Sequence, residues 1–574
     1  MFININQTKN FGELKKRFLG IYDKFPNLLH VRRFVFSLLL IFVLIIILFY
    51  KSWGRLDNYY MMDIPSYGGT YSEGLVGKVE KLNPMFASTN SVDYEVSSLI
   101  FSGLLKRSES GALVPDLAYN YTVSEDGREY LFYLRRNARW QNHDEYLSSK
   151  DVVFTFKAIQ HPDTKSPLKE NWKGVEVSAV DEWTVKFRLP GPNFAFTEMA
   201  TLGIVPEQAF SGIPYKNMSV SKFNLEPYGT GPFEFSNLLE KAEHQEVNLI
   251  GSNDYSPHPP YLDKLNFKIY SERGALMEAY LKKDISAFAG MSLEEYETSK
   301  KFKKMQYIEM RLPRYVGLFF NVKNDKLSDL AVRQAIAKAV NRNDLLGQSK
   351  IAGTTVYYPV LSGQIGYSKD LPKNDFNLEE ARKILDDKGW KLEGDYRKKD
   401  GKTLEFELLT NNSEEFKRVS SSIKDQLGEV GVKVFVKQVD VASMQKDYIK
   451  PRKYQSILIG ESIGSDPDLY SYWHSTQVAD PGVNLSVFSN EKMDKALETA
   501  RQTKDLNLKK EKLVSAQKVI MSETPAVFLY SPSFIFGVNK NFKGIKHVKM
   551  VDPSSRYIGI EEWYLKTRKQ LKIQ

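Results

Sequence analysis

Residues 316–340 read VGLFFNVKNDKLSDLAVRQAIAKAV, in which a strand pattern is followed closely by a helix pattern. The opening residues are mostly apolar and include aromatic and β-branched side chains, which favours a buried strand. Ser328 or Asp329 then stands where a helix N-cap is expected. Beyond this cap, Val332 and Ile336 fall on one helical face. The stretch therefore predicts a β–α unit of an α/β lobe.

The same alternation of strands and helices continues as far as residue 531. A capping box of Asn377 and Glu380 begins a second helix. Further helices are predicted over 414–427 and within 490–521, and further strands at 432–439, 454–460 and 525–531. Residues 67–310 hold more strands and turns, together with a helix capped by Ser148 and Asp151, and predict a mixed α+β lobe. We therefore expect a bilobal chain.

Composition limits the chemistry that the chain can perform. With 574 residues, 42% hydrophobic and 26% charged, it is typical of a globular protein with two to four domains. The absence of cysteine excludes disulfides, cysteine-ligated metals and thiol nucleophiles. The seven histidines form no HExxH pattern, and no phosphate-binding GK[ST] loop occurs. We expect neither a metal nor a cofactor.

An apolar segment near the N-terminus predicts a membrane helix. Residues 34–50, FVFSLLLIFVLIIILFY, carry no charge and at about 1.5 Å per residue nearly cover a ~30 Å hydrocarbon core. Residues 1–33 hold seven basic and two acidic side chains, which places the N-terminus in the cytosol. The expected protein is single-pass in the plasma membrane, with its main part extracellular or periplasmic.

The residues argue against three alternatives to this membrane helix. A cleaved signal peptide is disfavoured by the long charged region before residue 34 and the lack of an A-x-A site after Tyr50. A lipoprotein is excluded because no cysteine exists, and a buried core helix because the run is apolar on every face. Residues 51–66 are expected to be a short linker, with Trp53, Tyr59 and Tyr60 at the headgroup level.

The charge outside this arm argues against nucleic acid as a partner. The total is +10, and the arm supplies +5 of it, so residues 34–574 carry only +5. Such a mild excess suits an anionic cell-envelope surface better than nucleic acid.

Several patterns occur in an order that a known family shares. They are Leu82-Asn83-Pro84, the stretch 113–157, PYGTGPF at 227–233, LFFNVKNDKLSDLAVRQAIAKAVNRNDL at 318–345, Asp466-Pro467-Asp468 and the closing strand at 525–544. In this respect the chain resembles the extracellular peptide-binding proteins of ABC importers, the oligopeptide/dipeptide-binding family, also called solute-binding family 5. The resemblance covers about Gly68 to Glu562.

The resemblance implies a periplasmic-binding-protein-like clamp of three domains that closes on its ligand. Domain I is expected at 67–93, 221–312 and 526–574, domain II at 94–220 and domain III at 313–525. Strands crossing near 310–320 and 520–530 would act as hinges. The expected protein is a non-catalytic monomer that hands a peptide or related small solute to separate permease and ATPase subunits.

The resemblance also places ligand contacts. Ser88, Thr89, Asn90 and Ser91 match a first-lobe loop that approaches the peptide, and the second lobe contributes Gly460, Glu461, Ser462, Ile463, Asp466, Tyr470 and Trp473. Many members place a carboxylate here to hold the peptide α-ammonium, but this chain has Ile463 or Gly464 at that position. We predict that Glu461 is the anchor instead, because alternate strand residues share a face. The alternative is a solvated glutamate at a strand end.

Two further interpretations of this region remain as alternatives. Gly460 to Gly464 spell G-x-S-x-G, and with Asp466 or Asp468 and His474 or His547 they could form a serine hydrolase. Pro467 follows too soon for the helix that such an elbow needs. A calcium site at Asp466 and Asp468 is disfavoured, because two carboxylates supply too few oxygen ligands for this ion.

The chain could also be a tethered peptide receptor without an importer.

Overall fold

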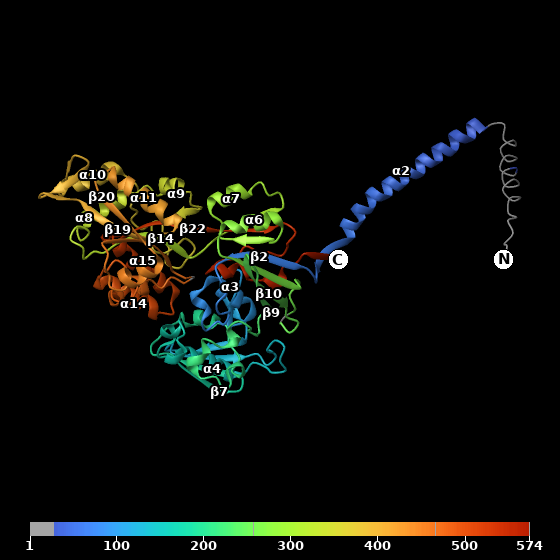
Figure 1. Ribbon diagram of the computed structural model, residues 1–574, viewed down its shortest axis with the longest axis horizontal. Helices are drawn as coiled ribbons and strands as arrows, with labels where there is room; N and C mark the ends of the chain where they lie inside the picture. The colour runs from blue at the N-terminus through green and yellow to red at the C-terminus, as the bar shows by residue number, and fades with distance from the viewer. Residues whose placement is uncertain (1–15, 17–27, 256–257, 465, 573–574) are drawn as a thin grey trace. The chain divides into compact units, whose positions relative to one another are not determined.

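The computed structural model describes residues 16, 28–255, 258–464 and 466–572 (Figure 1). They fall into two compact units. One extends to Ser66 and also contains the chain from Lys566 onward, and the other is Tyr67–Leu565.

The smaller unit is a long helix that leads into a two-stranded ribbon. Helix α2 (Leu28–Tyr60) contains Arg33–Lys51, the one stretch of the described residues that is apolar and long enough to cross a membrane. Strand β1 (Met61–Ser66) pairs antiparallel with β23 (Lys566–Leu571) near the C-terminus. The backbone amide of Lys572 donates to the carbonyl of Tyr60 at 2.8 Å. The stretch expected to be a linker, 51–66, is therefore helix as far as Tyr60 and strand beyond it.

A twelve-stranded sheet forms the frame of the larger unit. Its strand order is β20 (Lys433–Val439), β19 (Glu405–Asn411), β21 (Ser456–Ser462), β14 (Arg314–Phe320), β22 (Ala526–Asn539), β12 (Ala287–Ala289), β2 (Thr70–Val76), β11 (Lys264–Tyr270), β10 (His244–Gly251) and β9 (Phe233–Glu240). Strands β13 (Met305–Arg311) and β15 (Gly353–Thr355) also pair with β22.

Strand β22 runs through both halves of this frame. Its first part pairs with β14, where Val316 lies opposite Tyr530, and its last part pairs with β13, where Arg311 lies opposite Ser533. The chain thus crosses between the halves at 312–313 and again at 531–532, within the stretches from which hinges were predicted or directly beside them. We call 67–312 with 532–565 the first lobe and 313–531 the second lobe.

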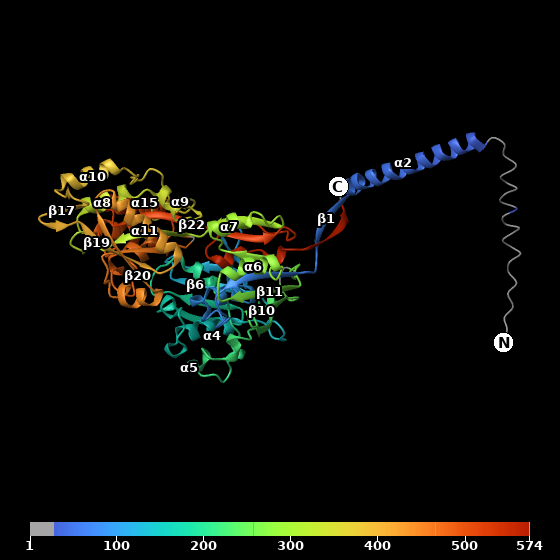
Figure 2. The ribbon, with the colours of Figure 1, turned by 45° about the horizontal axis from the view of Figure 1, so that its top comes forward.

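Helices cover the strands of the second lobe (Figures 1 and 2). They are α8 (Leu330–Ala339), α9 (Arg342–Gln348), α10 (Leu378–Asp387), α11 (Glu414–Gly428), α12 (Val441–Ser443), α13 (Leu469–Trp473), α14 (Glu491–Gln502) and α15 (Leu506–Glu523). Asp329 caps α8 by accepting from the Ala331 amide at 2.9 Å, and Val332 and Ile336 are buried as predicted. A small ribbon of β16 (Lys391–Glu393), β17 (Tyr396–Lys399) and β18 (Lys402–Thr403) completes the lobe.

The first lobe contains an inserted antiparallel sheet as well as its share of the frame. That sheet has the order β5 (Ala118–Val123), β6 (Glu129–Leu134), β8 (Thr184–Arg188), β7 (Glu176–Asp181), and α4 (Ser149–Gln160) packs on it behind the predicted Ser148 capping box. The remaining elements are α3 (Ser91–Ile100), α5 (Tyr215–Met218), α6 (Gly274–Lys282), α7 (Leu293–Ser299), β3 (Leu105–Arg107) and β4 (Leu113–Pro115). The predicted fold class is confirmed.

The glycines at 229 and 231 have a packing role. A Cβ atom at Gly229 would stand 2.1 Å from the carbonyl oxygen of Ile100, and one at Gly231 would stand 2.6 Å from the carbonyl carbon of the same residue. Glycine is required here because this turn lies directly against the end of α3.

Candidate ligand-binding cleft

A cavity of about 1130 Å³ borders both lobes. The first lobe contributes α3, the β3–β4 region, residues 195–203 and residues 551–561, and the second lobe contributes Gly464, Asp466 and Asp468. This volume is slightly above the ~300–1000 Å³ that is usual for small-molecule pockets. A solute that fills this cavity would touch both lobes at once.

The predicted first-lobe loop forms the start of α3. Asn90 is its N-cap, and the side-chain oxygen accepts from the amides of Val92 at 3.0 Å and Asp93 at 3.4 Å. Ser88 lines the cavity, whereas Thr89 and Ser91 are exposed next to it without forming its wall. The helix then presents Tyr94, Ser97, Ser98 and Leu99 to the cavity. As the N-cap of α3, Asn90 therefore orients the part of the cavity wall that this helix forms.

Glu461 lies near the end of β21 with its side chain turned into the second lobe. The residue is 6% exposed, and Oε2 accepts a hydrogen bond from the Tyr315 hydroxyl at 2.6 Å. Burial raises the pKa of Glu461 to about 8, although the hydrogen bond from Tyr315 acts in the opposite direction. Glu461 is not among the residues that line the cavity, and neither are its neighbours Gly460, Ser462 and Ile463. Its role as an ammonium anchor stays a prediction.

The two aspartates after this strand do reach the cavity. Asp466 pairs with Lys509 of α15, and Asp468 pairs with Arg501 of α14 at 2.9 Å. Among the described residues, the Asp466 Oδ1 atom is buried without a hydrogen-bond partner. No group of three or more potential metal ligands occurs in the described part of the chain.

The aromatic residues that follow are held by packing. The Tyr470 ring stacks on His474 with 4.0 Å between centroids, and the Arg501 guanidinium lies 4.4 Å from the same ring. Trp473 is fully buried in the second-lobe core. Neither aromatic residue lines the cavity.

The sequence did not single out the charged side chains of the first-lobe wall. Lys106 Nζ lies 3.7 Å from Asp116 Oδ1 and donates to the Tyr255 hydroxyl at 3.0 Å. Arg107 pairs with Glu198. Two more carboxylates, Asp552 and Glu561, line the same wall from a distant part of the chain. These residues come from four separate segments, so no local motif could have revealed them.

A comparison with family models shows which family the chain belongs to. Residues 112–481 match the model described as "Bacterial extracellular solute-binding proteins, family 5 Middle". The chain belongs to this family.

Relatives of family 5 match over most of the chain. The oligopeptide-binding protein AppA of Bacillus subtilis is 26% identical over 87% of this chain and 92% of its own length. The dipeptide-binding protein of Escherichia coli is 25% identical over 84% of this chain and 92% of its own length.

Solved structures share the bilobal fold. AppA of Bacillus subtilis in complex with a nonapeptide has a TM-score of 0.71 at 24% identity, covering 88% of this chain and 100% of that one. NikZ of Campylobacter jejuni in complex with Ni(L-His) has a TM-score of 0.71 at 26% identity, covering 86% and 99%. This family 5 chain is therefore a substrate-binding protein built on the same scaffold.

The geometry around Ser462 differs from that of a hydrolase nucleophile. Ser462 ends β21, and its carbonyl accepts from the Tyr472 hydroxyl. Gly464 then takes a φ of +68°, and the next helix, α13, begins only at Leu469. His474 contacts Thr476 and Glu498. Ser462 is exposed, but the sharp strand-to-helix turn that the G-x-S-x-G pattern requires is not formed.

Proposed function

We propose that this chain is the membrane-tethered substrate-binding component of an ABC importer and that it captures peptides in the cleft. The observation that carries the proposal is a cavity bordered by both lobes of a family 5 fold. The relatives AppA and the Escherichia coli protein are an oligopeptide-binding and a dipeptide-binding protein, which supports a peptide as the solute.

Capture would proceed by hinge closure at the two crossings. A ligand that touches both lobes binds the closed form more tightly, and so shifts the population toward it. Residues 312–313 separate the paired strands β13 and β14, and at 531–532 β22 changes from pairing with β14 to pairing with β13 while it also pairs with β15. Both crossings thus lie where the strand pairing of one lobe gives way to that of the other, which supports rotation at these points.

The apolar part of α2 would hold the receptor in the plasma membrane with its N-terminus in the cytosol. Its side chains from Phe34 to Tyr50 are exposed in the structure, as expected of a helix that is surrounded by lipid. Tethering would raise the effective concentration of the clamp near its permease and ATPase partners. We propose that the clamp itself is a monomer without catalytic activity.

Mass spectrometry of the co-purifying solute tests this proposal. The full chain is purified from membranes in detergent, denatured, and the released small molecules are identified. We expect peptides, and their rebinding to the emptied protein should be measurable by calorimetry. Release of chemically altered products, or no binding of any peptide, would overturn the proposal.

A Ser462→Ala variant separates capture from the hydrolase alternative. Because Ser462 contacts Tyr472 through its carbonyl and not its hydroxyl, we expect peptide affinity within about twofold of the parent. A peptidase or esterase activity that disappears in this variant would favour the hydrolase instead. Growth on peptides that depends on an adjacent permease would separate an importer from a receptor without one.

A further inference from the structure

The charges of the cavity are strongly unequal. Its lining residues include two basic side chains, Lys106 and Arg107, and seven acidic ones: Glu109, Asp116, Glu198, Asp466, Asp468, Asp552 and Glu561. Residues 34–574 as a whole carry a net charge of +5, the total of +10 less the +5 of the N-terminal arm. The acidity therefore belongs to the cleft and does not reflect the composition of the chain.

Some of these acids are neutralised by cations outside the cavity. Asp466 forms an ion pair with Lys509, and Asp468 forms one with Arg501. Glu109 forms an ion pair with Lys546 at 2.5 Å. These pairs add little net field, so the excess negative charge must come from the remaining first-lobe wall.

In that wall, Lys106 faces two carboxylates. Asp116 is its ion-pair partner at 3.7 Å, and the negative charge of Glu561 acts on both residues of this pair. Burial is the main reason why the pKa of Asp116 is raised, and the charge of Glu561 adds to it. Among the described residues, no ion pair or hydrogen bond is found for the Glu561 carboxylate. One negative charge is left over.

Arg107, like Lys106, faces two carboxylates. It pairs with Glu198, and the charge of Asp552 also acts on it. Asp552 accepts a hydrogen bond from the Tyr94 hydroxyl at 3.3 Å and caps the turn that contains Tyr557. Tyr94, Asp552 and Tyr557 all line the cavity. A second negative charge is left over at the cavity wall.

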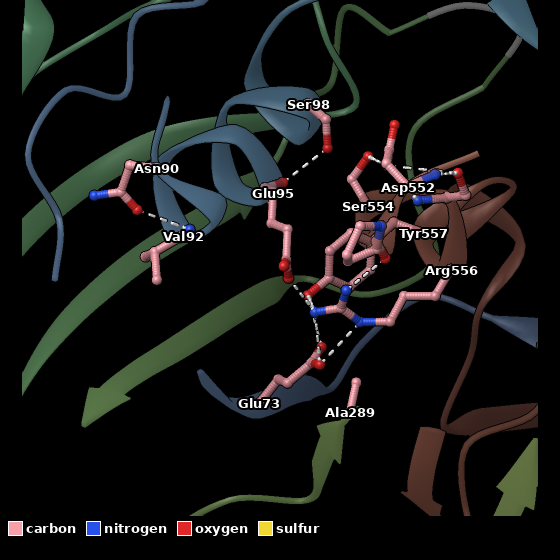
Figure 3. A network of polar contacts seen from close by, with 12 residues as sticks. Glu73, Asn90, Val92, Glu95, Ser98, Ala289, Asp552, Ser554, Arg556 and Tyr557 are labelled. Atoms are coloured by element: carbon pink, nitrogen blue, oxygen red, sulfur yellow. Dashed lines mark hydrogen bonds and ion pairs between the residues drawn. The ribbon is translucent and has the colours of Figure 1, made fainter. Parts of the chain in front are cut away.

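A third group lies directly behind Tyr557. Figure 3 shows Arg556 between the carboxylates of Glu73 and Glu95. Its Nη2 atom is 2.8 Å from Glu73 Oε1 and 2.5 Å from Glu95 Oε2, and it also donates to the Tyr557 hydroxyl at 2.5 Å. Arg556 is 2% exposed and Glu73 is 0% exposed, so water screens this group poorly. Again two carboxylates share one cation.

We propose that the cleft selects solutes with a net positive charge, and peptides containing lysine or arginine in particular. This inference rests on the proposed peptide-binding function and names its substrate class. In a closed cleft, charges act through a lower effective dielectric than in water, so a wall whose carboxylates outnumber its cations favours a cationic guest and disfavours an anionic one. A ligand cation near Asp552 and Glu561 would complete the charge balance of the wall.

Selection from a defined mixture tests this preference. The full chain in detergent is emptied, incubated with a pool of peptides from three to nine residues with equal numbers of basic, neutral and acidic sequences, and the retained peptides are identified by mass spectrometry. We expect enrichment of lysine and arginine and depletion of aspartate and glutamate. Equal retention of all classes, or enrichment of acidic peptides, would overturn the inference while leaving peptide binding intact. Retention of no peptide would instead overturn the function on which it rests.

A matched pair of variants localises the effect. Glu561→Gln removes a carboxylate of the wall, and Glu562→Gln removes one from the next residue, which pairs with His258 at 2.9 Å and does not line the cavity. For a retained basic peptide, we expect Glu561→Gln to weaken affinity about tenfold and Glu562→Gln about twofold or less. Asp552→Asn, which keeps the helix cap, should resemble Glu561→Gln. Equal effects of the two glutamine variants would overturn the assignment to this wall.

Discussion

At the scale of single residues, Glu461 makes stability depend on pH. Its pKa is about 8 in the folded protein because the side chain is buried, against an ordinary value of 4.5. The stability contributed by its bound proton is complete below about pH 4.5 and is lost as the pH rises through about 8. Glu461→Gln keeps an acceptor for Tyr315 without the charge. We therefore expect the free energy of unfolding of this variant to exceed that of the parent by up to a few kcal/mol at pH 9 and to match it near pH 4.5. Urea unfolding at both pH values measures this, and a pH-independent difference would contradict it.

The same variant tests the predicted ammonium anchor. If Glu461 binds the peptide α-ammonium, Glu461→Gln lowers the affinity for a peptide with a free N-terminus by about tenfold or more. The affinity for the N-acetylated form of the same peptide is then unchanged. If both forms bind the variant as they bind the parent, the carboxylate acts only within the second lobe. The N-acetylated peptide is the matched control, because it lacks only the charge in question.

Residue-level prediction from the sequence worked where the cause was local. Asp329 and Ser148 occupy helix starts as predicted, and a cap needs only the few residues that follow it, so these patterns are visible in one stretch. The triad of Glu73, Arg556 and Glu95 spans nearly the whole chain. No local sequence pattern predicts that these three residues pair or that they are buried.

At the scale of elements, the Gly229–Gly231 turn is a test of close packing. Gly229→Ala places a Cβ atom 2.1 Å from the Ile100 carbonyl oxygen, a contact that backbone movement must relieve. We expect a loss of about 2–4 kcal/mol in the free energy of unfolding, measured with urea. Gly191→Ala is the control, since its Cβ meets nothing within 4 Å. Equal stability of both variants would refute this role.

The β1–β23 ribbon gives a second prediction at this scale. Asp63 lies directly opposite Lys569, and the natural chain has no cysteine, so a double Asp63→Cys, Lys569→Cys variant should form one intramolecular disulfide under mild oxidation. A Met62→Cys, Lys569→Cys variant places the thiols on opposite faces and should form it far more slowly. Linked peptides after proteolysis report the bond. Equal yields would show that this register is not kept.

The ribbon also shows why strands are harder to foresee than helices. MMDIPS carries no strong strand pattern by itself, and its partner lies some 500 residues along the chain. A strand is stabilised by cross-strand neighbours, whereas the caps and faces of α8 and α10 are set within a dozen residues. The α/β alternation of the second lobe was readable for this reason, and the ribbon was not.

At the scale of the whole clamp, the topology of β22 makes the two lobes mechanically distinct. Within the described residues of the larger unit, each lobe has its own buried clusters, while the covalent connections between lobes are confined to 312–313 and 531–532. Closure can then change contacts between the lobes without disturbing either interior. The balance between open and closed forms is set by the few contacts that join the lobes elsewhere.

Lys504 makes such a contact away from the cavity. From the loop between α14 and α15, its Nζ donates to the carbonyls of Ser124 at 3.3 Å and Glu125 at 2.7 Å, and lies 4.8 Å from the centroid of the Phe194 ring. All three partners belong to the first lobe. The contact exists only when the lobes are together, so it stabilises the closed form, by about 0.5–1 kcal/mol for an exposed cation.

Lys504→Ala should therefore weaken peptide affinity about two- to fivefold, because part of the binding free energy must then close a less stable clamp. Calorimetry gives the affinity, and small-angle scattering should show that the ligand still compacts the protein. Lys510→Ala, which removes an exposed lysine from α15 of the same lobe, is the control and should leave affinity unchanged. If both variants bind peptide as the parent does, Lys504 does not set the balance. If the ligand compacts neither the variant nor the parent, closure itself is excluded.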